Sequence, residues 1–431
     1  MHSQILRVCW PATVLAIVQS GGNVLAAGAQ YQVLYHFQGS PDGSEPYARL
    51  VMDGAGNLYG TTYHGGTEGT VFRLTLGADG RWTESVLYDF SNPLGGGGGF
   101  PLGPVTLDAT GNLYGTAGPS NGNNGVVFDI TPSSSGLWNE DVVHTFSGNS
   151  DGVQPRAGVI FDKAGNLYGT TTMSGPVGGS CGTVFQLTPF NGGCQESILH
   201  IFTCKKDGSF PSANLVFDRT DNLYGTTELG GVGCGINGCG TVFKMTQTSG
   251  VWNKATIYAF KGGSDGYWPT SALVLDKTGS LYGTTSLGGV GPCVIEGGSG
   301  CGTVFKLTPR PKGEWKKTVI YSPDGTSGGG LFGGVVFDRA GDLYGTTTFY
   351  GVVGPQCAAG CGSVFKLTPA TGSLWTETTL YEFDGADDGG EPWGGLVIDK
   401  PGNIFGTTVF GGSSTGTCQY GGCGVVFEIT P

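Results

Sequence analysis

The sequence predicts an all-β fold, a seven-bladed β-propeller of four-stranded blades. The tripeptide Leu-Tyr-Gly recurs along the chain at spacings from 54 residues (Tyr114 to Tyr168) to 62 residues (Tyr282 to Tyr344). The central residues of the seven copies are Tyr59, Tyr114, Tyr168, Tyr224, Tyr282, Tyr344 and, in a final Ile-Phe-Gly variant, Phe405. Each copy also contains short apolar runs bounded by turn residues. A repeated unit with these runs is typical of a ring of β-blades.

Each copy contains four runs of β-branched and aromatic residues, which is the composition of strands. In the last copy the first three runs are 396–398, 404–408 and 425–429, and the fourth run is seen in an earlier copy as 375–383. An Asp-x-x-Gly-Asn sequence between the first two runs of a copy predicts a tight turn, because Asp accepts a hydrogen bond from the backbone two residues on. The chain after residue 30 shows no sustained helical period. The turn aspartates are Asp53, Asp108, Asp162, Asp218, Asp276, Asp338 and Asp399.

The two ends of the chain complement each other. The last copy stops at Thr430 and Pro431, directly after its third run, whereas residues 32–37 (QVLYHF) match the fourth run of other copies, such as 86–90. An open ring would expose a strand edge that invites aggregation. We therefore expect the N-terminal segment to complete the last blade and residues 30–431 to form one domain.

The first 29 residues are expected to be a secretory signal peptide. Arg7 precedes the mostly apolar run 8–18, and Ala27-Gly28-Ala29 has the form of a signal-peptidase site; a short buried strand is the alternative. No later run is long enough to cross a bilayer. The net charge of −12, with 13% charged residues, argues against nucleic acid and anionic membranes as partners. We expect a soluble monomer that is secreted or associated with the cell surface.

The cysteines also favour export. Eight of the 12 lie as close pairs in the variable loops, and Cys181 and Cys204 fall opposite each other if residues 181–204 form a hairpin. Disulfides in an oxidising compartment explain this pattern, with zinc binding as the alternative. The predicted bridges are Cys234–Cys239, Cys293–Cys301, Cys357–Cys361, Cys418–Cys423 and Cys181–Cys204. Cys194 is then left unpaired.

The binding face is expected where the loops between second and third strands meet the blade-to-blade connections, since both emerge on the same side of a propeller. These loops lengthen along the chain, and they carry aromatic residues that could stack on sugar rings. The candidate ligand-binding residues are Tyr63, His64, Tyr267, Trp268, Phe349, Tyr350, Trp393 and Tyr420, with Phe210 also in a connection. The alternative for Trp268 and Trp393 is that they plug the channel entrance.

Other chemistry is sparse. The connections contain Asp-Gly pairs that could bind Ca²⁺ through oxygen or serve as plain turns; their aspartates are Asp42, Asp151, Asp207, Asp265, Asp324 and Asp388. His36, His144 and His200 lie in the outer runs, where other copies have Tyr or similar residues, so we expect them to pack. No Ser/His/Asp or Cys/His nucleophilic set can be assembled, and no cofactor motif is found. Neither catalytic residues nor a required cofactor are therefore predicted.

The pattern N-L-Y-G-T-T-x-x-G-G…G-T-V-F-x-L-T-P, at 57–75 and 222–246, resembles the GloVer tandem repeat of the Gloeobacter–Verrucomicrobia type. The resemblance implies an exported bacterial repeat protein of a group whose members carry differing C-terminal surface anchors. The chain ends at Pro431 without a sorting tail, so we expect either a released protein or a longer natural chain. The D-x-x-G-N-L-Y turn is also similar to that of NHL and gluconolactonase-like propellers, but a turn of the scaffold transfers no activity.

Two functions follow as hypotheses. The first is a non-catalytic exported module that binds a glycan or a protein through the long-loop face. The second is a secreted hydrolase or lyase that acts on a polysaccharide or lactone with carboxylates at the channel mouth. A pair of buried acids with raised pKa on this face would favour the enzyme.

Overall fold

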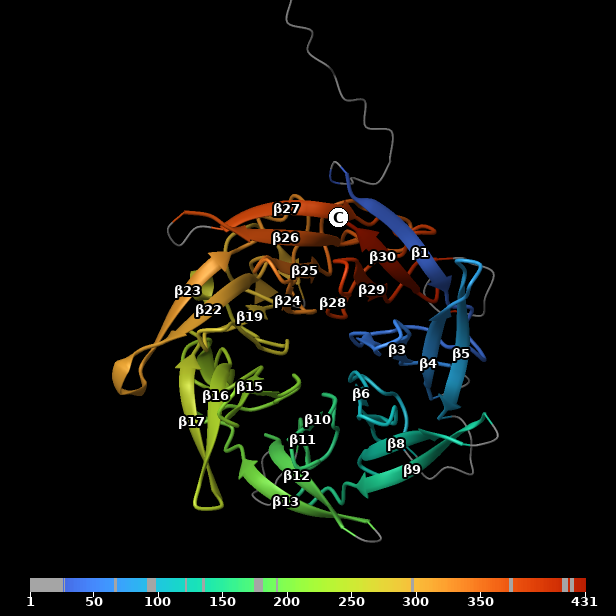
Figure 1. The fold of residues 1–431 in the computed structure, drawn as a ribbon. Coiled ribbons are helices and arrows are strands. Elements are labelled where there is room, and N and C mark those ends of the chain that lie inside the picture. Colours follow the sequence, from blue (N-terminus) through green and yellow to red (C-terminus); the bar gives the residue numbers. More distant parts are fainter. Residues whose placement is uncertain are drawn as a thin grey trace, which may run out of the picture.

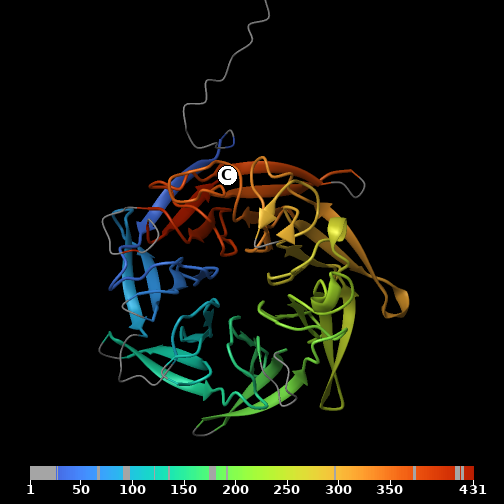
Figure 2. The same cartoon turned by 180° about the vertical axis from the view of Figure 1, so that it is seen from behind.

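Seven four-stranded antiparallel sheets form a closed ring around a central channel (Figures 1 and 2). This confirms the predicted all-β propeller. The computed structural model describes residues 26, 28–65, 68–90, 98–120, 122–133, 136–173, 181–190, 193–295, 298–371, 375–412, 418 and 422–431. Most of the predicted leader lies outside these residues, so the signal peptide remains a prediction.

Each blade runs from a short inner strand to a long outer strand. Blade 1 contains β2 (Val51–Met52), β3 (Leu58–Thr62), β4 (Thr70–Leu76) and β5 (Trp82–Asp89), and blade 2 contains β6 (Thr106–Leu107), β7 (Leu113–Ala117), β8 (Val126–Pro132) and β9 (Trp138–Thr145). Blade 3 contains β10 (Ile160–Phe161), β11 (Leu167–Thr171), β12 (Thr183–Phe190) and β13 (Gly193–Ile201), and blade 4 contains β14 (Val216–Phe217), β15 (Leu223–Thr227), β16 (Thr241–Thr248) and β17 (Val251–Ala259).

Blade 5 contains β18 (Val274–Leu275), β19 (Leu281–Thr285), β22 (Thr303–Pro309) and β23 (Trp315–Tyr321). Blade 6 contains β24 (Val335–Phe337), β25 (Leu343–Thr347), β26 (Ser363–Pro369) and β27 (Trp375–Glu382). Blade 7 contains β28 (Val397–Ile398), β29 (Ile404–Thr408), β30 (Val425–Thr430) and β1 (Gln30–His36). Loops contain β20 (Val294–Ile295), β21 (Gly298–Ser299) and the 3₁₀ turns η1 (Gly235–Asn237), η2 (Gly263–Asp265) and η3 (Pro311–Gly313).

The ring is closed by β1, which forms the outer strand of blade 7. It pairs antiparallel with β30, with Gln30 opposite Thr430 and His36 opposite Val425. The ring of Tyr31 stacks on that of Tyr381 in blade 6 at 3.9 Å. The predicted exchange of strands between the termini is therefore confirmed, and Figure 1 shows β1 lying beside β30.

A glycine and a phenylalanine form the central cross-strand pair of every blade. In blade 3, Gly169 of β11 faces Phe185 of β12, and a Cβ added to Gly169 would lie 2.5 Å from Cζ of that ring. The ring of Phe185 also meets Phe146 of blade 2 edge-on at 5.2 Å. The seven buried rings in this position belong to Phe72, Phe128, Phe185, Phe243, Phe305, Phe365 and Phe427. The hydrophobic core thus lies between neighbouring blades, where the absence of a side chain on glycine leaves room for the ring.

The repeated aspartate fixes the turn between the first two strands. In blade 1, Oδ1 of Asp53 accepts the N–H groups of Ala55 (2.8 Å) and Asn57 (2.9 Å), and Oδ2 accepts Asn57 Nδ2 (2.7 Å) and Tyr59 OH (3.1 Å). Burial alone would raise the pKa of Asp53, but these hydrogen bonds lower it overall. The turn aspartates are therefore occupied by the scaffold.

Removal of residues 30–37 should cause aggregation or a large fall in melting temperature, because it exposes the edge of β30. Differential scanning calorimetry and light scattering measure these effects. Tyr31→Phe is a matched control, since it keeps the ring stacked on Tyr381 and should leave the ring closed. An unchanged melting curve after the deletion would contradict closure by β1.

Gly169→Ala should lower the free energy of unfolding by about 1–3 kcal/mol, the usual cost of overpacking a tight core. Denaturant titration gives this value. Gly54→Ala is the control, because a Cβ there meets nothing within 4 Å. Adding Phe185→Leu to Gly169→Ala should recover part of the loss. Equal effects of the two alanine variants would show that the ring does not need the space above Gly169.

Candidate functional site

One face of the ring carries both the blade-to-blade connections and the loops between second and third strands. In blade 5, Tyr267 of the connection and Leu287 of the loop exchange backbone hydrogen bonds of 3.0 and 3.2 Å. Bridges in the other blades join Ser44 to His64, Gly99 to Gly118, Val153 to Met173, Ser209 to Leu229, Gly329 to Phe349 and Gly390 to Phe410. The two kinds of segment therefore meet around one mouth of the channel, as the sequence predicts.

A ring of seven left-handed residues borders this mouth, one residue after each bridge. Their φ angles lie between +54° and +73°, and they are Glu45, Phe100, Gln154, Phe210, Trp268, Gly330 and Glu391. Residues with a side chain are strained in this conformation. Each donates its backbone N–H to a loop carbonyl of the preceding blade, as Glu45 does to Cys423 (3.0 Å). These bonds hold the strained backbone and join the blades around the mouth.

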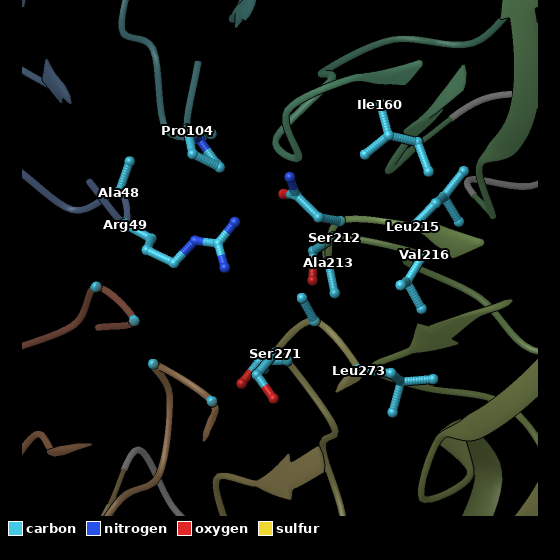
Figure 3. Close-up of a pocket in the computed structure, with 18 of the residues that line it drawn as sticks. Ala48, Arg49, Pro104, Ile160, Ser212, Ala213, Leu215, Val216, Ser271 and Leu273 are labelled. Atoms are coloured by element: carbon cyan, nitrogen blue, oxygen red, sulfur yellow. The ribbon is translucent and has the colours of Figure 1, made fainter. Parts of the chain in front are cut away.

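Below this ring the channel forms a cavity of about 1190 Å³. The residue two positions after each left-handed residue lines it: Tyr47, Leu102, Arg156, Ser212, Thr270, Phe332 and Trp393. Figure 3 shows Arg49 extending into the cavity, with Pro104, Ser212 and Ser271 on the wall. The Arg49 side chain is exposed to the cavity but enclosed by its walls, and this burial lowers its pKa.

A continuous series of aromatic rings follows the mouth from blade 2 through blades 1 and 7 to blade 6. We call it the aromatic arc; its members are Phe100, Tyr63, Tyr47, Trp393, Phe332 and Phe349, all partly exposed. Successive ring centroids lie 5.2 Å (Phe100 to Tyr63), 5.7 Å (Tyr63 to Tyr47), 5.8 Å (Tyr47 to Trp393) and 4.4 Å (Trp393 to Phe332) apart, with Phe349 5.6 Å from Trp393. The arc presents flat apolar surfaces beside an open cavity.

Three of the predicted ligand-binding residues, Tyr63, Phe349 and Trp393, belong to the arc. His64 is exposed and lies 4.8 Å from the Tyr63 ring. Trp268 lines the cavity with Trp393. Tyr420 lies outside the described residues. The sequence reasoning missed Tyr47, Phe100 and Phe332. Six of the seven connections share a proline, and alignment on it would have placed Tyr47 in register with Trp393 and Phe100 in register with Trp268.

Tyr267 and Tyr350 have a different environment from the arc, because their hydroxyl groups hold the long loop of blade 5. Tyr267 OH accepts the N–H of Ser299 (2.9 Å), and Tyr350 OH accepts that of Val294 (2.6 Å). Both rings pack on a small core around Leu287 and the Cys293–Cys301 disulfide. These two tyrosines therefore hold a loop of this face in place, and neither lines the cavity.

Two carboxylates flank the middle of the arc. Glu45 and Glu391 occupy the left-handed position of blades 1 and 7; Tyr47 OH donates to Glu45 Oε2 (3.4 Å), and Trp393 Nε1 donates to Glu391 Oε2 (3.4 Å). Burial raises the pKa of Glu391 to about 7, although the bond from Trp393 opposes the rise. Glu391 therefore exchanges a proton near neutral pH, and Glu45 occupies the equivalent position in blade 1.

The five predicted cysteine pairs are joined as disulfides in the structure, with Cα atoms 5.0 to 5.3 Å apart. In four blades the second cysteine of the pair also supplies a carbonyl to the left-handed ring, as Cys361 does to the N–H of Glu391 (2.8 Å). Cys194 is a free thiol. Five disulfides suggest an oxidising environment. None of the helices in the described part of the chain has the length and hydrophobicity needed to span a bilayer.

The connection aspartates bind the outer strand of the preceding blade. Asp265 accepts Tyr258 OH (2.7 Å) and the N–H of Lys261 (2.9 Å). The same contact joins Tyr35 to Asp42, His200 to Asp207 and Tyr381 to Asp388. His144 and His200 pack on phenylalanine rings as expected, but they also face these aspartates, which the sequence reasoning missed.

Asp324 is not equivalent to the other connection aspartates, so its place in the predicted series is wrong. It accepts the N–H and hydroxyl of Thr326 (2.9 and 2.6 Å) instead of reaching the outer strand. Gly328 contacts Thr347 as Gly266 contacts Thr285, which places Ser327 in the aspartate position. In the connection from blade 5 to blade 6, the Asp-Gly pair therefore lies three residues before the position that the aspartate occupies in the other connections.

The family model for the Gloeobacter/Verrucomicrobia repeat matches residues 22–178 and 124–295. No curated protein matches the sequence. Among solved structures, the chain resembles a protein of unknown function from Dyadobacter fermentans (TM-score 0.45, 8% identity, 95% of this chain and 99% of that one). It also resembles a putative glucose dehydrogenase from Thermus thermophilus (0.42, 15%, 94% and 100%) and an ancestral GH74 enzyme (0.49, 14%, 90% and 51%). At these identities the likeness concerns the fold alone.

The protein should be more stable at pH 5 than at pH 8. Burial raises to about 7 the pKa of Glu84, Glu140, Asp388 and Glu391, so the folded chain holds protons between about pH 4 and 7 that the unfolded chain has released. Stability then falls as pH rises through this window. The lowered pKa values of His36 and His144 oppose this fall, but the four carboxyls outnumber them.

Melting temperatures from pH 4.5 to 8 measure this dependence. Asp388→Asn keeps an acceptor for Tyr381 OH and should flatten the profile. A melting temperature that rises from pH 5 to pH 8 would contradict the raised carboxyl pKa values.

Proposed function

The chain belongs to the Gloeobacter/Verrucomicrobia repeat family, and on the geometry of its channel mouth we propose that it is an exported, non-catalytic module that binds a glycan. The observation that carries the proposal is the aromatic arc beside the cavity. Three of its ring contacts are edge to face and two are tilted, so none of these pairs is stacked face to face. Ring surface is therefore left free, and sugar rings stack on such surfaces through their C–H faces.

Polar groups next to the arc support a saccharide ligand over a purely apolar one. Glu45, Tyr47 and Glu391 offer hydrogen-bond acceptors and a hydroxyl at the rim, where sugar hydroxyls would lie. Arg156 occupies the same position in blade 3 as Tyr47 in blade 1, and both Arg156 and Arg49 are exposed to the cavity. Arg49 makes no salt bridge with any described carboxylate, and a uronic acid would supply one. We therefore expect acidic glycans to bind more tightly than neutral ones.

The five disulfides support a site of action outside the reducing cytosol. The predicted leader, residues 1–29, agrees with this location. We propose a monomer that is secreted or held at the cell surface. A protein ligand on the same face is the competing occupant, and binding of surface proteins without any glycan would favour it.

A hydrolase or lyase is the second candidate, and the environment of Glu391 favours it. A carboxyl with a pKa of about 7 suits a general acid at neutral pH, and Glu45 in the adjacent blade would be its partner. Binding without turnover is the first proposal because the whole aromatic arc supports it, whereas the enzyme rests on Glu391 alone.

Glycan binding can be measured by array and by titration calorimetry, with neutral and uronate oligosaccharides. Trp393→Ala and Tyr47→Ala should each weaken binding by about 10-fold or more, which corresponds to about 1.4 kcal/mol. Phe190→Ala is the control, because Phe190 is 60% exposed in the β12–β13 hairpin, on the opposite side of the blade.

Binding that survives both arc variants, or no binding to any glycan, would overturn the proposal. Release of shorter products by the wild-type protein, lost in Glu391→Gln while binding persists, would establish the enzyme instead.

A further inference from the structure

A polar cluster recurs in the seams between neighbouring blades, outside the channel. It combines a Tyr or His of one outer strand, the connection aspartate, and a side chain from the next outer strand. Between blades 3 and 4, His200 Nε2 lies 2.9 Å from Asp207 Oδ2, and Lys254 Nζ lies 2.6 Å from Asp207 Oδ1. Between blades 4 and 5, Lys317 Nζ lies 2.9 Å from Asp265 Oδ1. Both lysine side chains are only 4% exposed, so each seam buries one ammonium ion against its aspartate.

The seam between blades 2 and 3 replaces this lysine with a carboxylate. Glu196 of β13 pairs with Leu187 of β12 in the same register in which Lys254 of β17 pairs with Met245 of β16. The cluster is therefore His144, Asp151 and Glu196. His144 Nε2 lies 3.5 Å from Glu196 Oε1 and 3.8 Å from Asp151 Oδ2, and one ligand atom from each residue lies within 4.8 Å of the others.

This cluster has buried polar atoms without partners. His144 Nε2 and Glu196 Oε1 are inaccessible to solvent and form no hydrogen bond with any described residue. Such atoms cost free energy unless another group satisfies them. The side chains are 18%, 8% and 18% exposed for His144, Asp151 and Glu196. Two carboxylates and an imidazole thus face one another where the two following seams place a buried cation.

The aspartate of the cluster is held in a fixed orientation. Ser147 donates its N–H to Asp151 Oδ2 and its hydroxyl to Asp151 Oδ1, both at 2.7 Å. Metal-binding carboxylates are commonly oriented by hydrogen bonds of this kind. The outer strands β9 and β13 position the two other side chains.

We propose that His144, Asp151 and Glu196 bind one divalent transition-metal ion, Zn²⁺ or a close analogue, in the seam between blades 2 and 3. Imidazole nitrogen with carboxylate oxygen is a donor set of zinc and its neighbours, whereas Ca²⁺ takes oxygen ligands. Two ligand atoms about 2.0–2.2 Å from one ion lie roughly 3–4 Å apart, which the separations of 3.5 and 3.8 Å satisfy. The ion would take the position that the Lys254 ammonium holds in the next seam, and it would link blade 2 to blade 3.

The other seams distinguish this site from a general acidic surface. Between blades 7 and 1, Tyr35 OH donates to Asp42 (2.6 Å) and Glu84 lies nearby, but this seam has no imidazole among its three groups. Between blades 3 and 4 the imidazole is present, but Lys254 neutralises the aspartate. We therefore expect one ion per chain.

The test uses the untagged chain, stripped with chelator and titrated with Zn²⁺, with Mn²⁺ and Ca²⁺ as comparators. Calorimetry and elemental analysis should give one equivalent of Zn²⁺, and Zn²⁺ should raise the melting temperature. Glu196→Lys recreates the neighbouring seam and should abolish binding while the fold is kept. Lys254→Glu should create a second site and raise the stoichiometry to two equivalents. His200→Gln is the matched control and should retain one equivalent.

Absence of Zn²⁺ binding by the wild-type chain would overturn the proposal, as would full binding by Glu196→Lys, because Cys194 or surface carboxylates would then be the ligands. If Lys254→Glu fails to fold, the loss of the single equivalent in Glu196→Lys, with an unchanged melting curve in the absence of metal, still decides the question.

Discussion

The contact between a glycine and a phenylalanine on neighbouring strands determines how the blades fit together. Gly169 leaves space for the ring of Phe185 within its own blade, and the same ring meets Phe146 of the preceding blade. The pair therefore acts along two directions, across the sheet and between sheets. Because it recurs in all seven copies, the spacing between blades is set by one repeated contact. Phe37, directly after β1, makes the same contact with Phe72 of blade 1.

Most of the fold could be predicted from the sequence because its determinants are local and repeated. The Asp53 turn depends on residues within six positions, and the match of 32–37 to the outer strands gave the closure of the ring. The shifted connection near Asp324 could not be predicted from the Asp-Gly pair alone. The spacing from Tyr321 to that aspartate is three residues, whereas Tyr258 and Asp265 are seven apart, so the register of the outer strand decides which aspartate is equivalent.

The sites were harder to predict, because they combine residues from different blades. Tyr63 and Trp393 stood out as loop aromatics, but Tyr47 joins them only once blades 7 and 1 are adjacent. His144 resembled a packing residue, since other copies have Tyr there. Its proximity to Glu196 depends on the angle between two outer strands, which no local pattern encodes.

The left-handed ring has an evolutionary consequence. Its hydrogen bonds use backbone atoms, so residues as different as Glu45, Gln154 and Trp268 hold the same place without altering the seams. The side chains at the mouth can then vary blade by blade while the architecture stays constant. Repeat duplication would supply the positions, and substitution at each would tune recognition separately. The channel mouth is therefore a variable recognition surface on a constant scaffold.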